Sequence, residues 1–233
     1  MTPRARRSPR RTEALSRERI VEAAVELLDT AGESGLTFRA LTERLSTGAG
    51  AIYWHVANKG ELLAAATDAV VAEAVSADVS SPRSAGSPRD GVRAVALGLY
   101  DAIEAHPWLA TQLALQLSRS PGGPVAPRIF EGIGRQVGAL GVSEDGWFTA
   151  TSVLVHYILG AAGQNAVNTE SGRALGPGVD RARFLDDVSA QWEQLDPDAY
   201  PFTRPVAHRM RGHDDREQFL AGIDLVLAGM AAR

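Results

Sequence analysis

Apolar residues recur with a helical period along most of the chain, and no stretch shows the strict alternation of a convincing strand. Between Ile20 and Ala31, apolar positions fall at i, i+3, i+4, i+7, i+8 and i+11, which predicts a helix over 17–31. Ser16 can cap that helix, and Gly32 and Gly35 should end it. The pattern as a whole predicts an all-α fold.

Turn and cap signals divide the rest of the chain. Thr37 should cap a second helix over 38–45, a tight turn follows at 46–48, and a third helix is expected over 49–56. Asn58 and Glu61 have the spacing of a capping box, so a fourth helix should run from there to about residue 76. Between Pro- and Gly-rich breaks, later helices are expected over 90–105, 108–118, 127–140, 143–168, 181–195 and 214–232.

Charge is distributed unevenly along the 233 residues, although the net value is only −4. Residues 1–60 carry ten Lys or Arg against seven Asp or Glu, which gives +3, and the remaining 14 against 21 give −7. A basic amino-terminal quarter on an acidic body suggests a small polyanion-binding module joined to a larger domain.

Several function classes are disfavoured by the residues that are missing. With no cysteine there is no thiolate metal site, and the five histidines are scattered without metal-ligand spacing. Neither a phosphate-binding Gly-rich motif nor a nucleophile-elbow motif is present. No apolar run approaches the roughly 18 residues of a membrane span. We therefore expect a cytoplasmic protein that is not an enzyme and has no metal, cofactor or membrane partner.

The third predicted helix has an unusual outer face. On a helical wheel Ile52, Val56 and Ala49 form a buried stripe, and Trp54 points nearly opposite, flanked by Gly50 and Ala51. Such small residues let a backbone approach another surface closely. Alternatively, Trp54 packs on its own domain and the small residues serve only the turn. The preceding short helix and tight turn favour a helix-turn-helix, whose second helix enters the major groove of DNA.

The segment LTFRALTERLSTGAGAIYWHVANKGELLAAA resembles the DNA-binding domain of the TetR family of bacterial transcriptional regulators, and IYWHVANKGELL is especially similar to the tetracycline-repressor branch. The resemblance covers residues 16–66 and makes the helix at 49–56 the recognition helix. It implies that Thr37, Tyr53, His55 and Lys59 contact the DNA backbone.

The chain departs from the family pattern in the turn and at the start of the recognition helix. Gly48 lacks the usual serine cap, and Ala49 and Gly50, at positions that often contact bases, have no polar side chain. Base recognition would then rely on Thr47, Arg39, a thymine-methyl contact from Ala49, or DNA shape. The expected DNA-binding residues are Thr37, Arg39, Thr47, Gly48, Ala49, Gly50, Tyr53, Trp54, His55 and Lys59.

Residues 1–15 are predicted to form a disordered arm that carries Arg4, Arg6, Arg7, Arg10 and Arg11. The arm could follow phosphates or enter the minor groove, or it could be a solvated tail. The chain is thus predicted to have three parts. The arm is followed by a DNA-binding domain over 16–62 and by a ligand-binding and dimerisation domain over 63–233.

Two helices of the body are similar to the pair that crosses the dimer interface in tetracycline-repressor-like proteins. They contain HYILGAAGQ and FLAGIDLVLAGM, and small residues such as Gly160 and Gly229 would allow close helix approach. Both could instead be core helices of a monomer. We expect a homodimer, because a single helix-turn-helix contacts too few bases to be selective.

The remaining helices should enclose a pocket with aromatic walls and a few amides and hydroxyls, suited to a small-molecule effector. For each candidate taken singly, ordinary core packing is the more common role. Gln164 stands where a carboxylate helps hold metal-chelated drug in the tetracycline branch, so magnesium-tetracycline is not expected. The candidates are Trp108, Gln112, Gln116, Phe130, Trp147, Thr151, Tyr157 and Gln164.

The sequence therefore predicts a homodimeric TetR-like regulator, most simply a repressor, that binds a palindromic DNA operator and is released by a small molecule. Two alternatives remain. One is an architectural DNA-binding protein without a ligand, and the other is a helical ligand-binding protein whose basic head is incidental.

Overall fold

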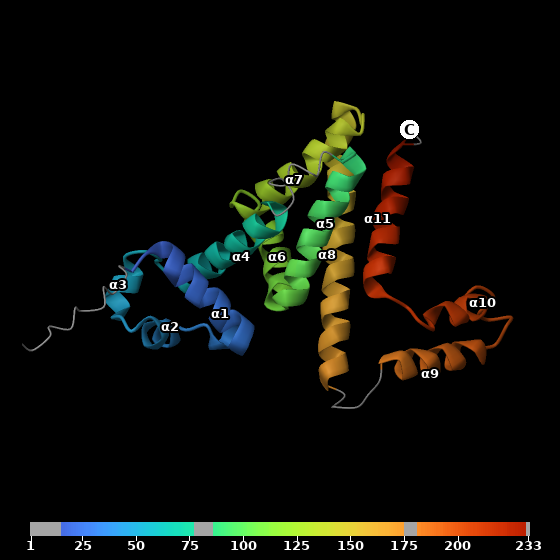
Figure 1. Cartoon of the computed structure of the whole chain (residues 1–233), viewed down its shortest axis with the longest axis horizontal. Coiled ribbons are helices and arrows are strands. Elements are labelled where there is room, and N and C mark those ends of the chain that lie inside the picture. Colours follow the sequence, from blue (N-terminus) through green and yellow to red (C-terminus); the bar gives the residue numbers. More distant parts are fainter. Residues whose placement is uncertain (1–14, 77–85, 175–180, 232–233) are drawn as a thin grey trace, which may run out of the picture. The chain divides into compact units, whose positions relative to one another are not determined.

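The computed structural model describes residues 15–76, 86–174 and 181–231, and within them the chain is helical with no strand, as predicted (Figure 1). It forms two compact units that meet at Ala66 and Thr67, inside the fourth helix. The Arg-rich arm and most of the predicted 77–89 loop lie outside the described residues.

The first unit contains α1 (Arg17–Gly35), α2 (Phe38–Leu45), α3 (Ala49–Tyr53) and the start of α4 (Lys59–Ser76). The Ser16 hydroxyl accepts a hydrogen bond from the Arg19 N–H at 3.3 Å and caps α1, as predicted. The helix does not end at Gly32. It kinks there with φ +65°, a conformation that glycine adopts without strain, and makes one more turn.

The second unit is built around α8 (Glu144–Ala174), which packs against α5, α6, α7 and α11. Figure 1 shows α8 running beside α5, with α9, α10 and η1 connecting its carboxyl end to α11. The elements of this unit besides α8 are α5 (Pro88–Ala105), α6 (Trp108–Arg119), α7 (Val125–Ala139), α9 (Arg181–Glu193), α10 (Thr203–Val206), the 3-10 helix η1 (Ala207–Met210) and α11 (Asp215–Ala231).

Two predicted boundaries in this unit are wrong. The long helix continues to Ala174 rather than ending at 168, and a single internal glycine such as Gly172 costs a helix only about 1 kcal/mol relative to alanine. The segment 196–213, which lies between two predicted helices and was predicted to contain none, contains α10 and η1. Pro205 fits there because it lies in the first turn of α10. The backbone N–H that proline lacks would have no partner within the helix at that position.

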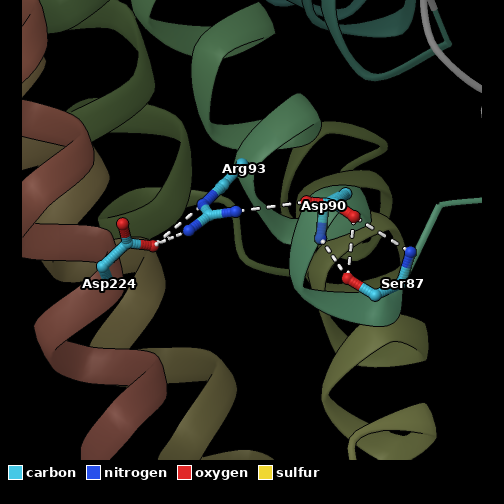
Figure 2. Close-up of polar contacts among 4 residues, drawn as sticks. All are labelled: Ser87, Asp90, Arg93 and Asp224. Carbon is cyan, nitrogen blue, oxygen red and sulfur yellow. Dashed lines mark hydrogen bonds and ion pairs between the residues drawn. The ribbon is translucent and has the colours of Figure 1, made fainter.

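A capping box that the sequence analysis missed begins α5 (Figure 2). The Ser87 hydroxyl accepts from the Asp90 N–H at 3.3 Å, and the Asp90 carboxylate accepts from the Ser87 N–H at 3.0 Å. Arg93 then donates to Asp90 at 3.1 Å and to Asp224 of α11 at 2.8 Å. The start of α5 is thereby tied to α11.

Replacing Ser87 by alanine should lower the free energy of unfolding by about 1 kcal/mol, because loss of the hydroxyl leaves the Asp90 N–H without its partner. The Ser87 hydroxyl and N–H hold the pKa of Asp90 below its ordinary value. The stabilisation from the ionised Asp90 carboxylate is therefore present at neutral pH and is lost as the pH falls through that lowered pKa. Urea unfolding at neutral pH measures the effect, and an unchanged midpoint would contradict it.

Candidate nucleic-acid interface and core of the second unit

The turn between α2 and α3 is set by local backbone geometry. Ser46 adopts a left-handed conformation, φ 50° and ψ 47°, which ends α2, and the Thr47 N–H donates to the Thr42 carbonyl at 3.1 Å. Gly48 then precedes α3 without any side-chain cap, as its lack of a side chain requires. Two short helices thus flank a three-residue turn, the arrangement of a helix-turn-helix.

Small residues cover the outer face of α3, and the exposed Trp54 follows directly after the helix. Ile52 and Val56 are fully buried, whereas Trp54 is 89% exposed. A Cβ added to Gly50 would meet no atom within 4 Å. Trp54 therefore does not pack on the first unit. This excludes the alternative that Trp54 is a core residue of its own domain.

Two details of the helical wheel are wrong. Ala49 is exposed rather than buried, and α3 ends at Tyr53 rather than at Val56. The His55 and Val56 N–H groups both donate to the Ile52 carbonyl, at 2.9 and 3.1 Å, so the chain tightens into a turn there. A uniform 100° step does not apply across that turn, and Ala49 begins the helix on its accessible side.

The aromatic and hydroxyl candidates keep groups available for an external partner. The Tyr53 ring stacks on Phe38 with centroids 4.5 Å apart and planes at 16°, yet Tyr53 remains 53% exposed. The Thr37 oxygen accepts from the Ala40 N–H at 3.1 Å, which leaves its O–H free to donate elsewhere. Thr47 and His55 are partly exposed on the same segment.

The two cationic candidates form internal contacts. Lys59 donates to the Glu33 carbonyl at 2.5 Å, and Arg39 donates to Glu43 at 2.9 Å across one turn of α2. The Arg39 pair is largely exposed, so it costs little to exchange for a phosphate. To contact a DNA phosphate, each cation must give up its bond to the glutamate or use a further N–H donor for the phosphate.

Glu61 places a carboxylate at the start of α4, where the helix dipole would otherwise favour a phosphate beside Lys59. Asn58 caps the Glu61 N–H at 2.9 Å, but the Glu61 carboxylate accepts from Ala57 at 2.8 Å rather than from Asn58. The Ala57 N–H and, more weakly, Arg17 hold the pKa of Glu61 below its ordinary value. A phosphate beside Lys59 would therefore lie near a carboxylate, which weakens the dipole argument for that contact.

The predicted effector residues lie on α6, α7 and α8, in the core of the second unit and on its surface. Gln112 and Thr151 are each only 3% exposed. Trp147 donates to the Val142 carbonyl at 2.8 Å, and Tyr157 donates to the Phe219 carbonyl of α11 at 3.1 Å. The Gln164 amide bonds Asn168 at 3.1 Å. Trp108, Gln116 and Phe130 are partly buried.

The structure holds a cavity of about 930 Å³ elsewhere in the second unit, and none of the eight predicted effector residues lines it. Its walls come from α5, α8, α9, η1 and α11. The sequence did not reveal this cavity, because its lining residues are far apart in the chain and come together only in the folded second unit. The one available signal was Asn165, a polar residue at a core position of α8.

Among the described residues, no group of three or more His, Asp or Glu side chains is placed to hold a metal ion. None of the described helices has both the length and the apolar character that crossing a membrane requires.

Comparison with known proteins matches both units. Residues 20–66 match the family of bacterial regulatory proteins called tetR, and residues 82–233 match the tetracyclin repressor-like carboxy-terminal domain. A solved TetR transcriptional regulator of Streptomyces coelicolor is 69% identical, with a TM-score of 0.84 over 94% of this chain and 99% of that one.

Two further relatives extend over nearly the full chain. An HTH-type transcriptional regulator of Saccharopolyspora erythraea is 31% identical over 94% of this chain and 85% of its own length. An HTH-type transcriptional repressor of Streptomyces coeruleorubidus is 28% identical over 97% of this chain and 80% of its own.

Proposed function

Since the chain belongs to the TetR family of bacterial transcriptional regulators, we propose that it represses transcription as a homodimer on a palindromic operator and that a small molecule releases it. The observation that carries the proposal is the outer face of α3, where an exposed Trp54 stands beside a glycine with open space around it.

The first unit supplies the chemistry for DNA. A helix whose outer face has almost no side chains can lie deep in the major groove, and the partly exposed groups around it can contact phosphates. Tyr53, Thr37 and Lys59 would hold the register on the backbone. Arg39, Thr47 and Ala49, with the shape of the duplex, would discriminate between bases.

The proposed homodimer pairs α8 and α11 of one subunit with those of the other. On α8, Val153 and Val167 are exposed on either side of Gly160, whose Cβ position is open. On α11, Leu225 is 74% exposed and Gly229 is open. An apolar face with small residues on two adjacent helices suits a four-helix contact between identical subunits.

Replacing Leu225 by alanine should weaken this dimer by on the order of tenfold, since two exposed leucines would lose contact area across the symmetric interface. Sedimentation of the full-length chain over a concentration series measures the change. Tyr200→Ala removes an exposed side chain outside α8 and α11 and should leave the dimer unchanged. Equal dissociation of both variants and the unaltered protein would refute the assignment of this face.

The effector is proposed to bind among the core residues of α6, α7 and α8, where Gln112 and Thr151 offer polar groups between apolar neighbours. Because α4 contains the junction of the two units, its displacement is the proposed route from effector to DNA. A coupling of about 1–3 kcal/mol would reduce operator affinity 5–150-fold.

The function is tested by fluorescence anisotropy with labelled DNA from upstream of the protein's own gene. Tyr53→Phe keeps the stacking on Phe38 and removes one phosphate donor, so affinity should fall about tenfold, whereas Tyr200→Phe should bind like the unaltered protein. A screen of small aromatic molecules should then identify at least one that releases the DNA from the protein. Binding that no molecule reverses would favour an architectural protein, and no saturable binding would refute DNA regulation.

A further inference from the structure

The cavity of about 930 Å³ lies outside the proposed effector core and has the size of a site for a drug-like molecule. The end of α5 contributes Tyr100 and Glu104 to its wall, and α8 contributes Asn165. Phe184 comes from α9, and the beginning of α11 supplies Asp215. Four helices of the second unit therefore converge on one space.

Two buried polar side chains on the wall have no hydrogen-bond partner within the described part of the chain. Tyr100 is 3% exposed and Asn165 is 8% exposed, and neither the phenol nor the side-chain amide forms a hydrogen bond there. No fully inaccessible side-chain nitrogen or oxygen among the described residues lacks a partner. Both groups must therefore reach open space, and the space that both line is this cavity.

The polarity of these groups defines what a ligand must offer. Burial, followed by the charges of Asp215 and Glu104, raises the pKa of Tyr100 to about 12, so the phenol keeps its proton at neutral pH and can donate. The Asn165 amide can both donate and accept. A ligand with oxygen acceptors and at least one N–H would satisfy both side chains.

The charged groups on the wall favour a cation. Arg181 forms an ion pair with Asp215, and Arg216 forms one with Asp101. Glu104 remains without an ion pair in the described part, and the Asp214 carboxylate is engaged only by the Glu217 N–H at 2.8 Å. The two arginines on the wall are thus already neutralised, and the uncompensated charge is negative.

The apolar part of the wall suits a flat ring. Phe184 is 50% exposed although it lines the cavity, and Leu185 and Met210 also belong to its lining. An aromatic ligand would cover Phe184 and gain stacking in addition to the buried area.

We propose that this cavity binds a planar aromatic cation whose ring lies on Phe184, whose polar atoms bond Tyr100 and Asn165, and whose charge lies near Glu104. This binding does not depend on DNA or on release from an operator.

The test uses the full-length protein without DNA and two dyes that share a xanthene ring but carry opposite charges, rhodamine 6G and fluorescein. Fluorescence anisotropy should show saturable binding of rhodamine 6G at least about tenfold tighter than that of fluorescein. Tyr100→Phe keeps the packing on Phe219 and should weaken rhodamine binding about fivefold, and Asn165→Ala should do the same.

Glu104→Gln should lower rhodamine affinity about threefold and narrow the preference over fluorescein, because an exposed carboxylate contributes modestly. Glu131→Gln on α7 makes the same change of charge outside the cavity and should leave both dyes unaffected. The proposal is overturned if rhodamine does not bind saturably, if fluorescein binds equally well, or if Tyr100→Phe and Glu104→Gln leave the affinity unchanged. A cavity filled by a second subunit would give the first of these results.

Discussion

Replacing Gly50 by glutamate is expected to weaken binding to operator DNA by at least about 100-fold while leaving the fold intact. The structure places nothing within 4 Å of the Cβ position, so the first unit accommodates the side chain. Against a duplex, the same side chain would occupy the space that the backbone needs and would bring a carboxylate toward phosphates. Like charges brought together at an interface cost several kcal/mol, which exceeds the loss of any single phosphate contact.

The matched control is Gly122→Glu, which adds the same charge at a position that is also open but lies in the second unit. It should bind DNA like the unaltered protein. Gly50→Leu separates bulk from charge and should also bind poorly. If Gly50→Glu binds operator within a factor of about three of the unaltered protein, α3 does not lie against DNA.

Replacing Gly98 by alanine is expected to lower the free energy of unfolding by at least about 3 kcal/mol, although alanine is the better helix former by about 1 kcal/mol. A Cβ at Gly98 would lie 2.1 Å from the Ala74 carbonyl oxygen and 3.1 Å from its carbon. Those are backbone atoms of α4, so α4 and α5 must move apart. The melting temperature should fall by about 6–12 °C.

Gly91→Ala on the same helix provides the control. Its Cβ would meet only the end of the Gln136 side chain, with the nearest oxygen at 2.5 Å, and that side chain can rotate away. This variant should melt at or slightly above the temperature of the unaltered protein. Equal melting temperatures for Gly98→Ala and Gly91→Ala would show that α4 and α5 are not in close contact at Ala74.

The elements that were predicted well carry their own local signals. Thr37 and Asn58 cap α2 and α4 through their side-chain oxygens, and the bonds they form reach only three residues along the chain. Ser87 and Asp90 use the same chemistry and could have been recognised. Aspartate in place of the usual glutamate, within a loop rich in Pro and Ser, obscured the pattern.

The errors arise where tertiary structure or short length overrides a periodic pattern. A helix of five residues is too short for a wheel to fix its faces, which is why Ala49 was placed inward and proved exposed. Within the proposed interface, the outward direction of Trp54 was nevertheless predicted correctly from its separation from Ile52 and Val56.

The cavity could not be predicted, because its walls depend on how α9 and η1 return toward α11. The sequence marked aromatic and amide residues as effector contacts, and several of them bond within the second unit instead, as Trp147 and Tyr157 do. The sequence shows which polar residues the chain contains. Only the structure shows that the Tyr100 hydroxyl and the Asn165 amide lack hydrogen-bond partners in the described part.

Methylation protection of the operator by dimethyl sulfate tests the central claim most directly, because the reagent modifies guanine N7 in the major groove and adenine N3 in the minor groove. The account predicts protection of guanines in two major-groove segments about 10–10.5 base pairs apart, present with the unaltered protein and absent with Gly50→Glu. Protection confined to adenines, or guanine protection that Gly50→Glu leaves intact, would contradict the placement of α3 in the major groove.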